Sequence, residues 1–468
     1  MSYIVLKSTC CSNALVRRFP RNQRKNVRVF CTHNSNTALN LRAFTDNHSN
    51  VKLFALATGQ MLCSIGTLIH DSYLPLYMKD TLGLSSIKIG AVQGLAQFLC
   101  QFTKGASGIV GDMLGSQERV LVFGTFMTLL CKPMFAMLSN VHVACGASFA
   151  MYWFFVAKLM DRMSKGIRET PSKAIINELA FKTGEPAHTA YGIRHSLATM
   201  GALIGTTVST GVFIASGKNF TLTFALSIIP PAFAFLWICI AFKEDILYKR
   251  KQEENIVKDK KTTVSLLKKV FIVVREFKPA YWQSLAVVIA LYFARFDASF
   301  LSLRAKHVMP TEYIPMLFFT SAIIQTLVTA PISKLSTQSV SMRNTILYLG
   351  FTMMILANAM FGLSNHISGM FGGAIFLGFH MAMTHSLTMS TMASYMPVGE
   401  IKGVGKLTGT AVSLTDLILG FVLALSNILA GYLCDMTQGS VGCFAGGALA
   451  TSVSVLLLLV FSKFGSLK

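Results

Sequence analysis

Twelve long apolar stretches constrain this chain more than any other feature of its sequence. Each has about the 20 residues that an α-helix needs to cross the hydrocarbon core of a bilayer. Because backbone polar groups find no water there, a spanning segment must satisfy its own hydrogen bonds as a helix. The sequence therefore predicts an all-α, polytopic membrane protein, with spans at 53–78, 86–111, 120–139, 143–163, 188–216, 220–242, 280–304, 312–334, 343–363, 367–395, 405–433 and 440–462.

Composition and charge agree with a membrane protein. Hydrophobic residues make up 53% of the chain and charged residues 13%, against roughly 25% charged residues in a soluble domain. The net charge of +22 does not indicate nucleic acid as a partner, because it gathers in two segments: 1–52 holds nine Lys and Arg, and 243–278 holds eleven. With twelve spans both segments lie on one side, so the positive-inside rule predicts both termini in the cytosol, stroma or matrix.

The N-terminal tail has the composition of a targeting segment. Residues 1–45 contain eight basic residues, several Ser and Thr, and no Asp or Glu. This fits an organellar transit peptide, and it fits equally a basic tail held at an anionic membrane surface. A transit peptide predicts the inner or envelope membrane of a chloroplast, plastid or mitochondrion in a eukaryotic cell; otherwise we expect the cytoplasmic membrane.

A charged segment divides the predicted spans six and six. It is rich in Lys and Glu until 264–274, where an amphipathic helix on the membrane surface is expected. Such a division is typical of two bundles with a solute site between them. The predicted organisation is a basic tail or transit peptide, an N-terminal six-helix bundle, a linker, a C-terminal six-helix bundle and a short tail, at 1–50, 51–242, 243–278, 279–463 and 464–468.

The fourth predicted span carries a stripe of charges. Spacings of three, four and seven residues put the six side chains on one side of a helix: Lys158, Asp161, Arg162, Lys165, Arg168 and Glu169. A charge within a bilayer is expensive, so such a face normally points into a bundle or a water-filled path. The stripe therefore favours a protein that moves a polar solute over a passive anchor.

Other spans add polar positions to this stripe. Isolated Ser and Thr can bond back to their own helix, but this does not explain Gln, Asp and His in several spans. The candidate substrate or coupling residues are Asp71, Gln97, Lys132, Lys158, Arg162, Arg194, Asp297, Arg304, His380 and Asp416.

These candidates have different expected roles. Asp71 and Asp416 lie on spans expected to line the cavity, where a carboxylate can bind solute or protons. Lys132 fits either a cavity lining or a side chain that snorkels beside Pro133. Arg304 fits a structural charge, and it lies about 10.5 Å along the helix from Asp297, so each needs a partner on another helix.

Six short motifs, in order along the chain, resemble a bacterial-type branch of the major facilitator superfamily. The fourth-span run D-R-M-S-K-G-I-R at 161–168 is similar to the branch signature D-R-x-G-K-G-I-R. The stretch 108–119 resembles the superfamily's loop motif after the second span. Further similar motifs lie at 192–205, 297–305, 378–382 and 430–435. The resemblance covers about 53–462 and implies the major facilitator fold, with alternating access between two bundles.

The resemblance also implies roles for individual residues. Gating and loop-motif roles fall to Gly108, Asp112, Gly115, Arg119, Lys165 and Arg168. In the superfamily the acid that matches Asp112 pairs with nearby cations and a helix N-terminus to latch the outward-open state. Gly201 and Gly205 form a small-residue motif that lets helices approach closely.

Several positions depart from the family pattern. Met113 and Ser116 stand where Arg is usual, Lys173 reverses a charge, and Ala198 replaces the usual acid of the fifth span. Lys158 also replaces an Arg, which is not neutral where planar pairing is needed. A diverged substrate or coupling scheme fits these departures, and so does a chain that no longer transports.

Together these features predict a secondary active transporter, a symporter or antiporter, for a small polar or anionic solute. Proton coupling through Asp71 or Asp416 is a further prediction. The expected partners are the solute, protons and lipid, the expected state is a monomer, and neither a cofactor nor a metal site is expected. The alternative is a non-transporting membrane receptor or adaptor. An enzyme is not expected, because no paired catalytic carboxylates appear and His380 and His385 point to different faces.

Overall fold

The structure of this chain is a computed structural model that describes residues 48–465 with gaps at 115, 184–186, 246–265, 337, 396–399, 402–404, 407 and 438–440. Helices dominate the described part, and β1 (Glu400–Ile401) pairs antiparallel with β2 (Gly405–Lys406) as a two-residue ladder. The predicted tail at 1–45 and most of the linker lie outside the described residues, as do the predictions made for them.

The helices fall into an N-terminal and a C-terminal series. The N-terminal series contains α1 (His48–Asp71), α2 (Leu74–Asp80), α3 (Ser86–Met113), α4 (Gln117–Ala136), α5 (Leu138–Thr183), α6 (Ala187–Ala215), α7 (Phe220–Leu226) and α8 (Ile229–Ala241). The C-terminal series contains α10 (Leu266–Glu276), α11 (Pro279–Ala294), α12 (Ser299–Ala305), η1 (Thr311–Tyr313), α13 (Pro315–Ser336), α14 (Val340–Leu363), α15 (Ile367–Tyr395), α16 (Thr408–Met436) and α17 (Val441–Lys463).

Ten helical segments within the described residues are long and apolar enough to cross a membrane. Two of the twelve predicted spans are not among them. The second corresponds to α3, which carries Gln93, Gln97, Gln101 and Lys104 on its length. The seventh is divided between α11 and the seven-residue α12. The polytopic all-α class is therefore confirmed, and the count of twelve spans stays a prediction.

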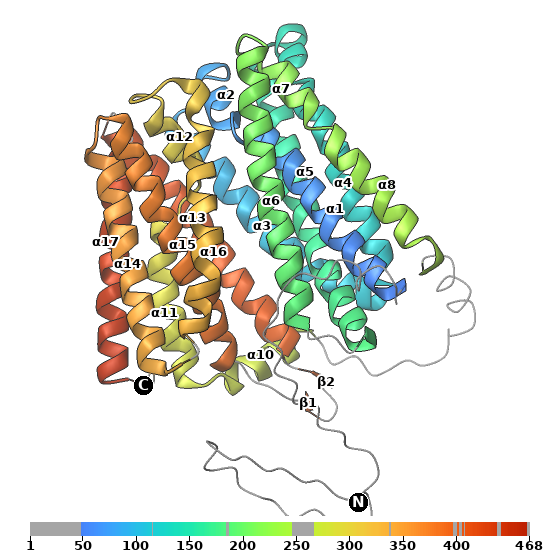
Figure 1. Ribbon diagram of the computed structural model, residues 1–468, viewed down its shortest axis with the longest axis vertical. Helices are drawn as coiled ribbons and strands as arrows, with labels where there is room; N and C mark the ends of the chain where they lie inside the picture. Colours follow the sequence, from blue (N-terminus) through green and yellow to red (C-terminus); the bar gives the residue numbers. More distant parts are fainter. Residues whose placement is uncertain are drawn as a thin grey trace, which may run out of the picture. The chain divides into compact units, whose positions relative to one another are not determined.

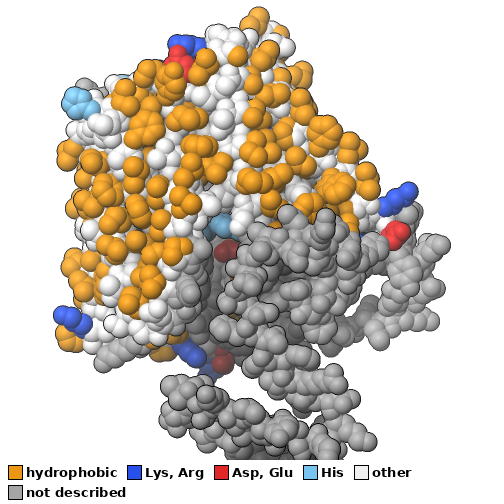
Figure 2. Space-filling view, in the orientation of Figure 1, with side chains coloured by type: hydrophobic (Ala, Val, Ile, Leu, Met, Phe, Trp, Pro, Cys, Tyr) orange, Lys and Arg blue, Asp and Glu red, His pale blue; other side chains and the backbone are white. Residues whose placement is uncertain are grey.

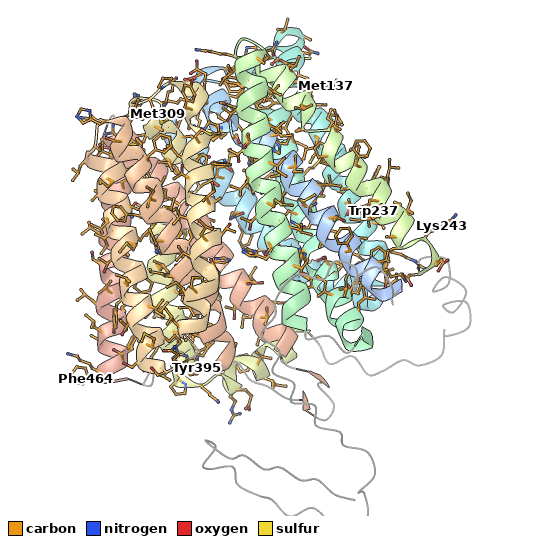
Figure 3. All side chains as sticks on the ribbon, in the orientation of Figure 1. Met137, Trp237, Lys243, Met309, Tyr395 and Phe464 are labelled. Atoms are coloured by element: carbon orange, nitrogen blue, oxygen red, sulfur yellow. The ribbon has the colours of Figure 1, made fainter. Side chains whose placement is uncertain are left out.

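The long helices run side by side and alternate in direction between two ends of the described part (Figure 1). At one end lie α2 and α12, and we call it the α2–α12 end. At the other end lies α10, and we call it the α10 end. Figure 3 places Met137 and Met309 at the α2–α12 end and Tyr395 and Phe464 at the α10 end. Helices α1–α8 form one group and α11–α17 form another.

The outer surface is rich in large apolar side chains, as a lipid-facing surface must be. Leu449 is 70% exposed, Leu327 and Ile240 are 68% exposed, and Phe233 is 61% exposed. A soluble protein rarely leaves such an extensive apolar surface in water. Figure 2 shows apolar side chains spread over both helix groups, with the few charged side chains near the two ends. This distribution supports an integral multi-pass membrane protein.

Three predicted spans are interrupted rather than continuous. The first breaks at residues 72–73 between α1 and α2, and the sixth breaks at 227–228 between α7 and α8, ahead of Pro230 and Pro231. The seventh breaks at 295–298, which corrects the expectation of one helix over 280–304. There Asp297 accepts hydrogen bonds from the backbone N–H and hydroxyl of Ser299, at 2.9 Å and 2.5 Å. Such a local bond competes with the helical ladder.

Glycines bring helices of the two groups into backbone contact. A Cβ atom at Gly90 would lie 2.2 Å from the Asn427 carbonyl oxygen, and one at Gly431 would lie 2.5 Å from the Ser86 carbonyl oxygen. Real Cβ atoms do not approach so closely, so α3 and α16 pack along a seam that only glycine permits.

The two groups share one apolar cluster at the α2–α12 end. It joins Tyr73, Tyr77 and Met78 from the first group to Phe300 and Leu301 from the second. Towards the α10 end the clusters are separate: one belongs to the first group, and two belong to the second. Within the described residues, apolar packing therefore joins the two groups at the α2–α12 end, and each cluster nearer the α10 end stays within one group.

Candidate functional site

Asp71 is the centre of a charge network between α1 and α5. Its carboxylate oxygens lie 2.7 Å from Lys158 Nζ and 2.8 Å from Arg162 Nη2. The side chains of Asp71 and Arg162 keep 18% and 14% of their surface exposed, whereas Lys158 is almost fully buried. Two of the predicted stripe residues thus meet the predicted acid of the first span.

A second ion pair lies deeper in the first helix group. Lys132 Nζ donates to Asp161 Oδ1 at 2.5 Å, and the Lys132 side chain has no exposed surface. Cys131 Sγ lies 3.6 Å from the same carboxylate oxygen. Lys132 therefore pairs inside the protein and does not snorkel to a lipid headgroup.

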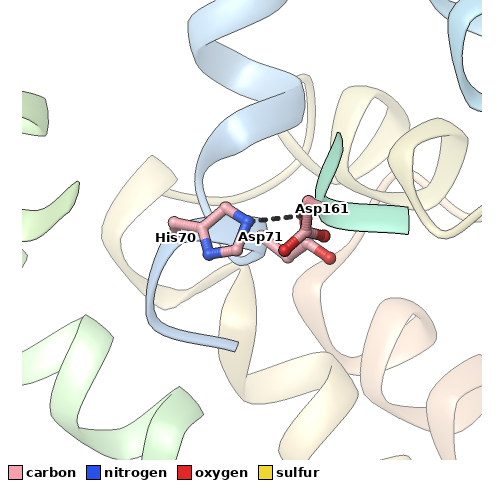
Figure 4. Close-up of side chains that lie close together, drawn as sticks. All are labelled: His70, Asp71 and Asp161. Atoms are coloured by element: carbon pink, nitrogen blue, oxygen red, sulfur yellow. Dashed lines mark ion pairs between the residues drawn. The ribbon is translucent and has the colours of Figure 1, made fainter. Parts of the chain in front are cut away.

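His70 connects the two pairs. Its Nδ1 lies 3.1 Å from the Gly66 carbonyl oxygen, its ring stacks on Phe135 at 4.5 Å, and its Nε2 lies 3.5 Å from Asp71 Oδ1. Figure 4 shows His70, Asp71 and Asp161 together, on neighbouring elements. The sequence analysis did not identify His70 as a site residue, although its position directly before Asp71 could have pointed to it.

The three side chains do not make a convincing metal site. One ligand atom from each of His70, Asp71 and Asp161 lies within 4.8 Å of the others. Each carboxylate, however, is already paired, and three cations stand around two carboxylates. A divalent cation would add to an excess of positive charge, which Coulomb repulsion opposes.

The fourth-span stripe divides into two adjacent rows. Asp161 and Arg168 face α4, where a Cβ on Gly124 would lie 2.9 Å from the Arg168 backbone nitrogen. Arg168 is buried, and its Nε and Nη1 have no hydrogen-bond partner within the described residues. The second row contains Lys158, Arg162, Lys165 and Glu169.

The second row continues towards the α10 end. Glu169 pairs with Lys104 of α3 at 3.2 Å and with Lys173 at 3.1 Å. Lys165 is exposed, and it has no ion pair among the described side chains. This row therefore extends from the buried centre towards the α10 end of the first group.

The C-terminal group faces this network with Arg295 and Asp297, at the break between α11 and α12. Arg295 Nε donates to His380 Nε2 at 3.2 Å, and its Nη2 lies 2.5 Å from Thr384 Oγ1. His380 is buried and is fixed by Nδ1, 2.9 Å from the Gly350 carbonyl oxygen. The backbone N–H of Asp297 donates to Asn427 Oδ1 at 2.6 Å.

Arg304 lies away from this centre. Its guanidinium donates to the carbonyl oxygens of Phe361 and Ser364 and to Asn365 Oδ1, at 3.0, 3.1 and 2.8 Å. These acceptors lie at the C-terminal end of α14, where helix carbonyls lack partners of their own. Arg304 is therefore suited to a structural role. Its partner is the C-terminal end of α14 and not Asp297.

The remaining candidates are spread over several helices. Asp416 is half-buried on α16, and within the described residues it makes no hydrogen bond or ion pair. Gln97 is half-buried on α3, and Arg194 Nη2 lies 3.5 Å from Gln60 Oε1. A Cβ at Gly201 would lie 2.4 Å from the Met61 carbonyl oxygen, so α6 packs tightly on α1.

The gating motif is only partly described. The side chain of Asp112 and the whole of Gly115 lie outside the described residues. Gly108 lies against α5, where its Cβ would be 3.0 Å from Thr170 Cγ2. Ser116 caps α4 by accepting from the Arg119 backbone N–H at 3.4 Å. The predicted latch therefore stays a prediction.

Polar contacts close the α2–α12 end, and the sequence analysis did not identify them. Lys306 pairs with Asp80, and Lys218 pairs with Glu312 at 2.5 Å. Asp435 of α16 accepts from the backbone N–H groups of residues 86 and 87, at 3.0 Å and 2.9 Å. A carboxylate at a helix N-terminus is electrostatically favourable. In the sequence, the lysines that stand alone in short loops with few cations could have pointed to these contacts.

On the face that Figure 2 shows, a histidine and an acidic side chain lie recessed where the two groups meet. His195 of α6 and His385 of α15 are exposed, as is Lys165. These three polar side chains are therefore accessible, whereas apolar packing and ion pairs close the α2–α12 end.

Known proteins share this architecture. A nucleoside transporter, NupG, superimposes with a TM-score of 0.60 at 16% identity, over 88% of this chain and 98% of that chain. A POT family transporter in complex with 5-aminolevulinic acid gives a TM-score of 0.64 at 12% identity, over 88% and 96%. At such identities the likeness shows the fold alone.

Sequence comparisons identify the family. An MFS-type transporter of Methanocaldococcus jannaschii is 27% identical over 164 residues, which cover 35% of this chain and 38% of that relative. The model of the Major Facilitator Superfamily matches residues 56–418, which is most of the described helical part. The chain belongs to the Major Facilitator Superfamily, a family of membrane transporters and not of enzymes.

Proposed function

We propose that this protein is a secondary transporter that moves a small polar or anionic solute by alternating access. The observation that carries the proposal is the asymmetry of its two ends. Apolar packing and ion pairs seal the α2–α12 end, while Lys165, in the charged row that runs from the centre towards the α10 end, is exposed. One sealed and one accessible end is the arrangement expected of one state in an alternating cycle.

The charges at the centre favour an anionic solute. Lys132, Lys158 and Arg162 surround two carboxylates, Asp71 and Asp161. One positive charge is left over in a site shielded from bulk water, where electrostatic interactions are strong. An anionic group on the solute would balance it.

Uptake into proteoliposomes tests the proposal. The full chain is reconstituted and exposed to a mixture of small metabolites, and the lumenal content is compared with that of protein-free liposomes. We expect one or a few anionic metabolites to enter only with the protein. Equal contents in both preparations, with correctly folded protein, would support the receptor or adaptor alternative instead.

We further propose that transport is proton-linked through Asp416. Asp71 and Asp416 are both candidates, but Asp71 already pairs with two cations, whereas Asp416 has no partner within the described residues. A carboxylate without a direct ion pair, in surroundings of low dielectric, can exchange a proton near neutral pH.

The Asp416→Asn variant tests this coupling. We expect it to lose accumulation driven by a pH difference while keeping exchange of solute at equal concentrations. Glu276→Gln, on the exposed part of α10, is the matched control and should behave as the unaltered chain. Undiminished pH-driven accumulation by Asp416→Asn would exclude Asp416 as the coupling group.

We also propose an oligomeric state, a membrane topology and a membrane for this protein. The chain is expected to act as a monomer with both termini on the cation-rich side, in an organellar inner or envelope membrane if it is eukaryotic. The fourth-span motif supports membership of the bacterial-type branch. Cysteine tags at positions 255 and 366 should label from opposite sides of the membrane, and labelling from one side would contradict this topology.

A further inference from the structure

A cavity of about 320 Å³ lies inside the C-terminal helix group. It is bounded by the α11–α12 break and by α13, α14, α15 and α17, so it is separate from the ion pairs of the first group. Its volume is at the lower end of the range of small-molecule sites, about 300 to 1,000 Å³. A molecule with a single ring and a short side chain matches this size.

Phenyl rings make the apolar wall of this cavity. Phe296, Phe318, Phe361 and Phe444 line it, together with aliphatic side chains such as Leu301. Phe296 and Phe444 meet edge to face, with ring centroids 5.5 Å apart. Aromatic walls of this kind favour a flat apolar body, which can stack on the rings or meet their edges.

Asn358 provides a polar group that the protein does not satisfy. It lines the cavity, is 3% exposed, and its Nδ2 has no hydrogen-bond partner within the described residues. A buried amide donor without an acceptor is costly, and such groups normally find a partner. An acceptor oxygen on a bound molecule would be that partner.

Arg295 provides the positive charge of the cavity wall. It lines the cavity too, and its described partners, His380, Thr384 and the ring of Tyr292, carry no negative charge. Asp297 and Gln325 are the other charged or amide groups of the cavity wall, and one carboxylate oxygen of Asp297 is bonded to Ser299.

We propose that this cavity binds the ring of the transported solute, and that the solute is a small organic monoanion with one aromatic or alicyclic ring. The carboxylate or equivalent group binds Arg295, an acceptor oxygen binds Asn358, and the ring lies among the phenylalanines. This inference rests on the proposed transport function and names its substrate class.

Equilibrium binding tests the class without requiring transport. The full chain is placed in lipid nanodiscs and titrated with radiolabelled phenylacetate, in competition with acetate, phenethylamine and phenylalanine. Acetate lacks the ring, phenethylamine carries the opposite charge, and phenylalanine is a zwitterion. We expect saturable binding of phenylacetate, with each competitor at least tenfold weaker.

Two variants locate this binding in the cavity. Asn358→Leu removes the amide donor at similar volume, and we expect about a tenfold loss of phenylacetate affinity, as for a hydrogen bond to a charged acceptor. Ala322→Phe fills the cavity and should abolish binding. The matched control is Thr352→Val, on an exposed position of the same α14, which should leave the affinity unchanged.

Three outcomes would overturn the inference. Tighter binding of phenylalanine than of phenylacetate would indicate a zwitterion site. Unchanged affinity in Asn358→Leu would indicate that water satisfies the amide and that the ligand binds elsewhere. If phenylacetate does not bind saturably while the metabolite screen finds a transported solute without a ring, the transport function stands and the proposed substrate class fails.

Discussion

At the scale of single residues, the centre of this protein depends on charges that have a partner on another helix. Asp71 is held by Lys158 and Arg162 of α5, and Asp161 is held by Lys132 of α4. Removing one member of a buried pair leaves the other uncompensated, which is far more damaging than removing both. Variants of these two ion pairs can therefore test function and stability separately.

Arg162→Ala tests the role of the network in function. Because Lys158 still pairs with Asp71, we expect the variant to fold and insert while solute flux in proteoliposomes falls at least tenfold. Arg275→Ala removes an exposed arginine on α10 and is the control that should keep full flux. Full flux in Arg162→Ala would make the pair merely structural.

Lys132 and Asp161 test the role of the network in stability. Lys132→Met alone, or Asp161→Leu alone, should lower the free energy of unfolding by about 3 to 5 kcal/mol. The double variant should be more stable than either single variant, because no charge is left unpaired. Thermal melting in detergent, followed by tryptophan fluorescence, measures all three. Additive losses in the double variant would argue against a coupled pair.

At the scale of elements, much of the helix pattern could be predicted from the sequence, whereas the breaks could not. Apolar length predicted nearly every long helix, since the bilayer leaves the backbone few alternatives. At the break over 295–298, Ser299 donates two hydrogen bonds to Asp297, and hydropathy does not reveal such local bonds. The stripe on α5 was predictable from spacing, but its partners depend on which helices pack against it.

Gly205 tests whether backbone contact sets the distance between α1 and α6. A Cβ there would lie 2.7 Å from the Ile65 carbonyl oxygen, so Gly205→Ala should destabilise the protein by about 1 to 3 kcal/mol. Gly211, on the same helix, has no atom within 4 Å of such a Cβ. Gly211→Ala should therefore be neutral or stabilising, since Ala favours helix over Gly. Melting temperatures that change equally would contradict the close contact.

At the scale of the whole molecule, the α2–α12 end is held shut by two kinds of contact. The α2–α12 end combines an apolar cluster with ion pairs in which Lys306 and Asp80 are each 35% exposed. Partly exposed pairs contribute only about 0.2 to 1 kcal/mol each. The ion pairs therefore adjust the balance between states, and apolar burial provides most of the closure.

The double variant Asp80→Asn/Glu312→Gln tests that balance. We expect the α2–α12 end to open more often, by about two- to tenfold in population, because two pairs are lost. A cysteine at Met78, in a chain without its native cysteines, should then react faster with a membrane-impermeant maleimide. Glu276→Gln at the α10 end is the control. An unchanged rate would show that these pairs do not contribute to closure.

The glycine seam between α3 and α16 has a mechanical consequence. At Gly90, Gly94 and Gly431 the backbones of α3 and α16 lie so close that no side chain fits between them, so the helices cannot slide past one another there by exchanging rotamers. We therefore expect a rearrangement that exchanges the two states to keep this contact and to turn about it. The displacement between the two groups is then smallest at the seam and grows with distance from it.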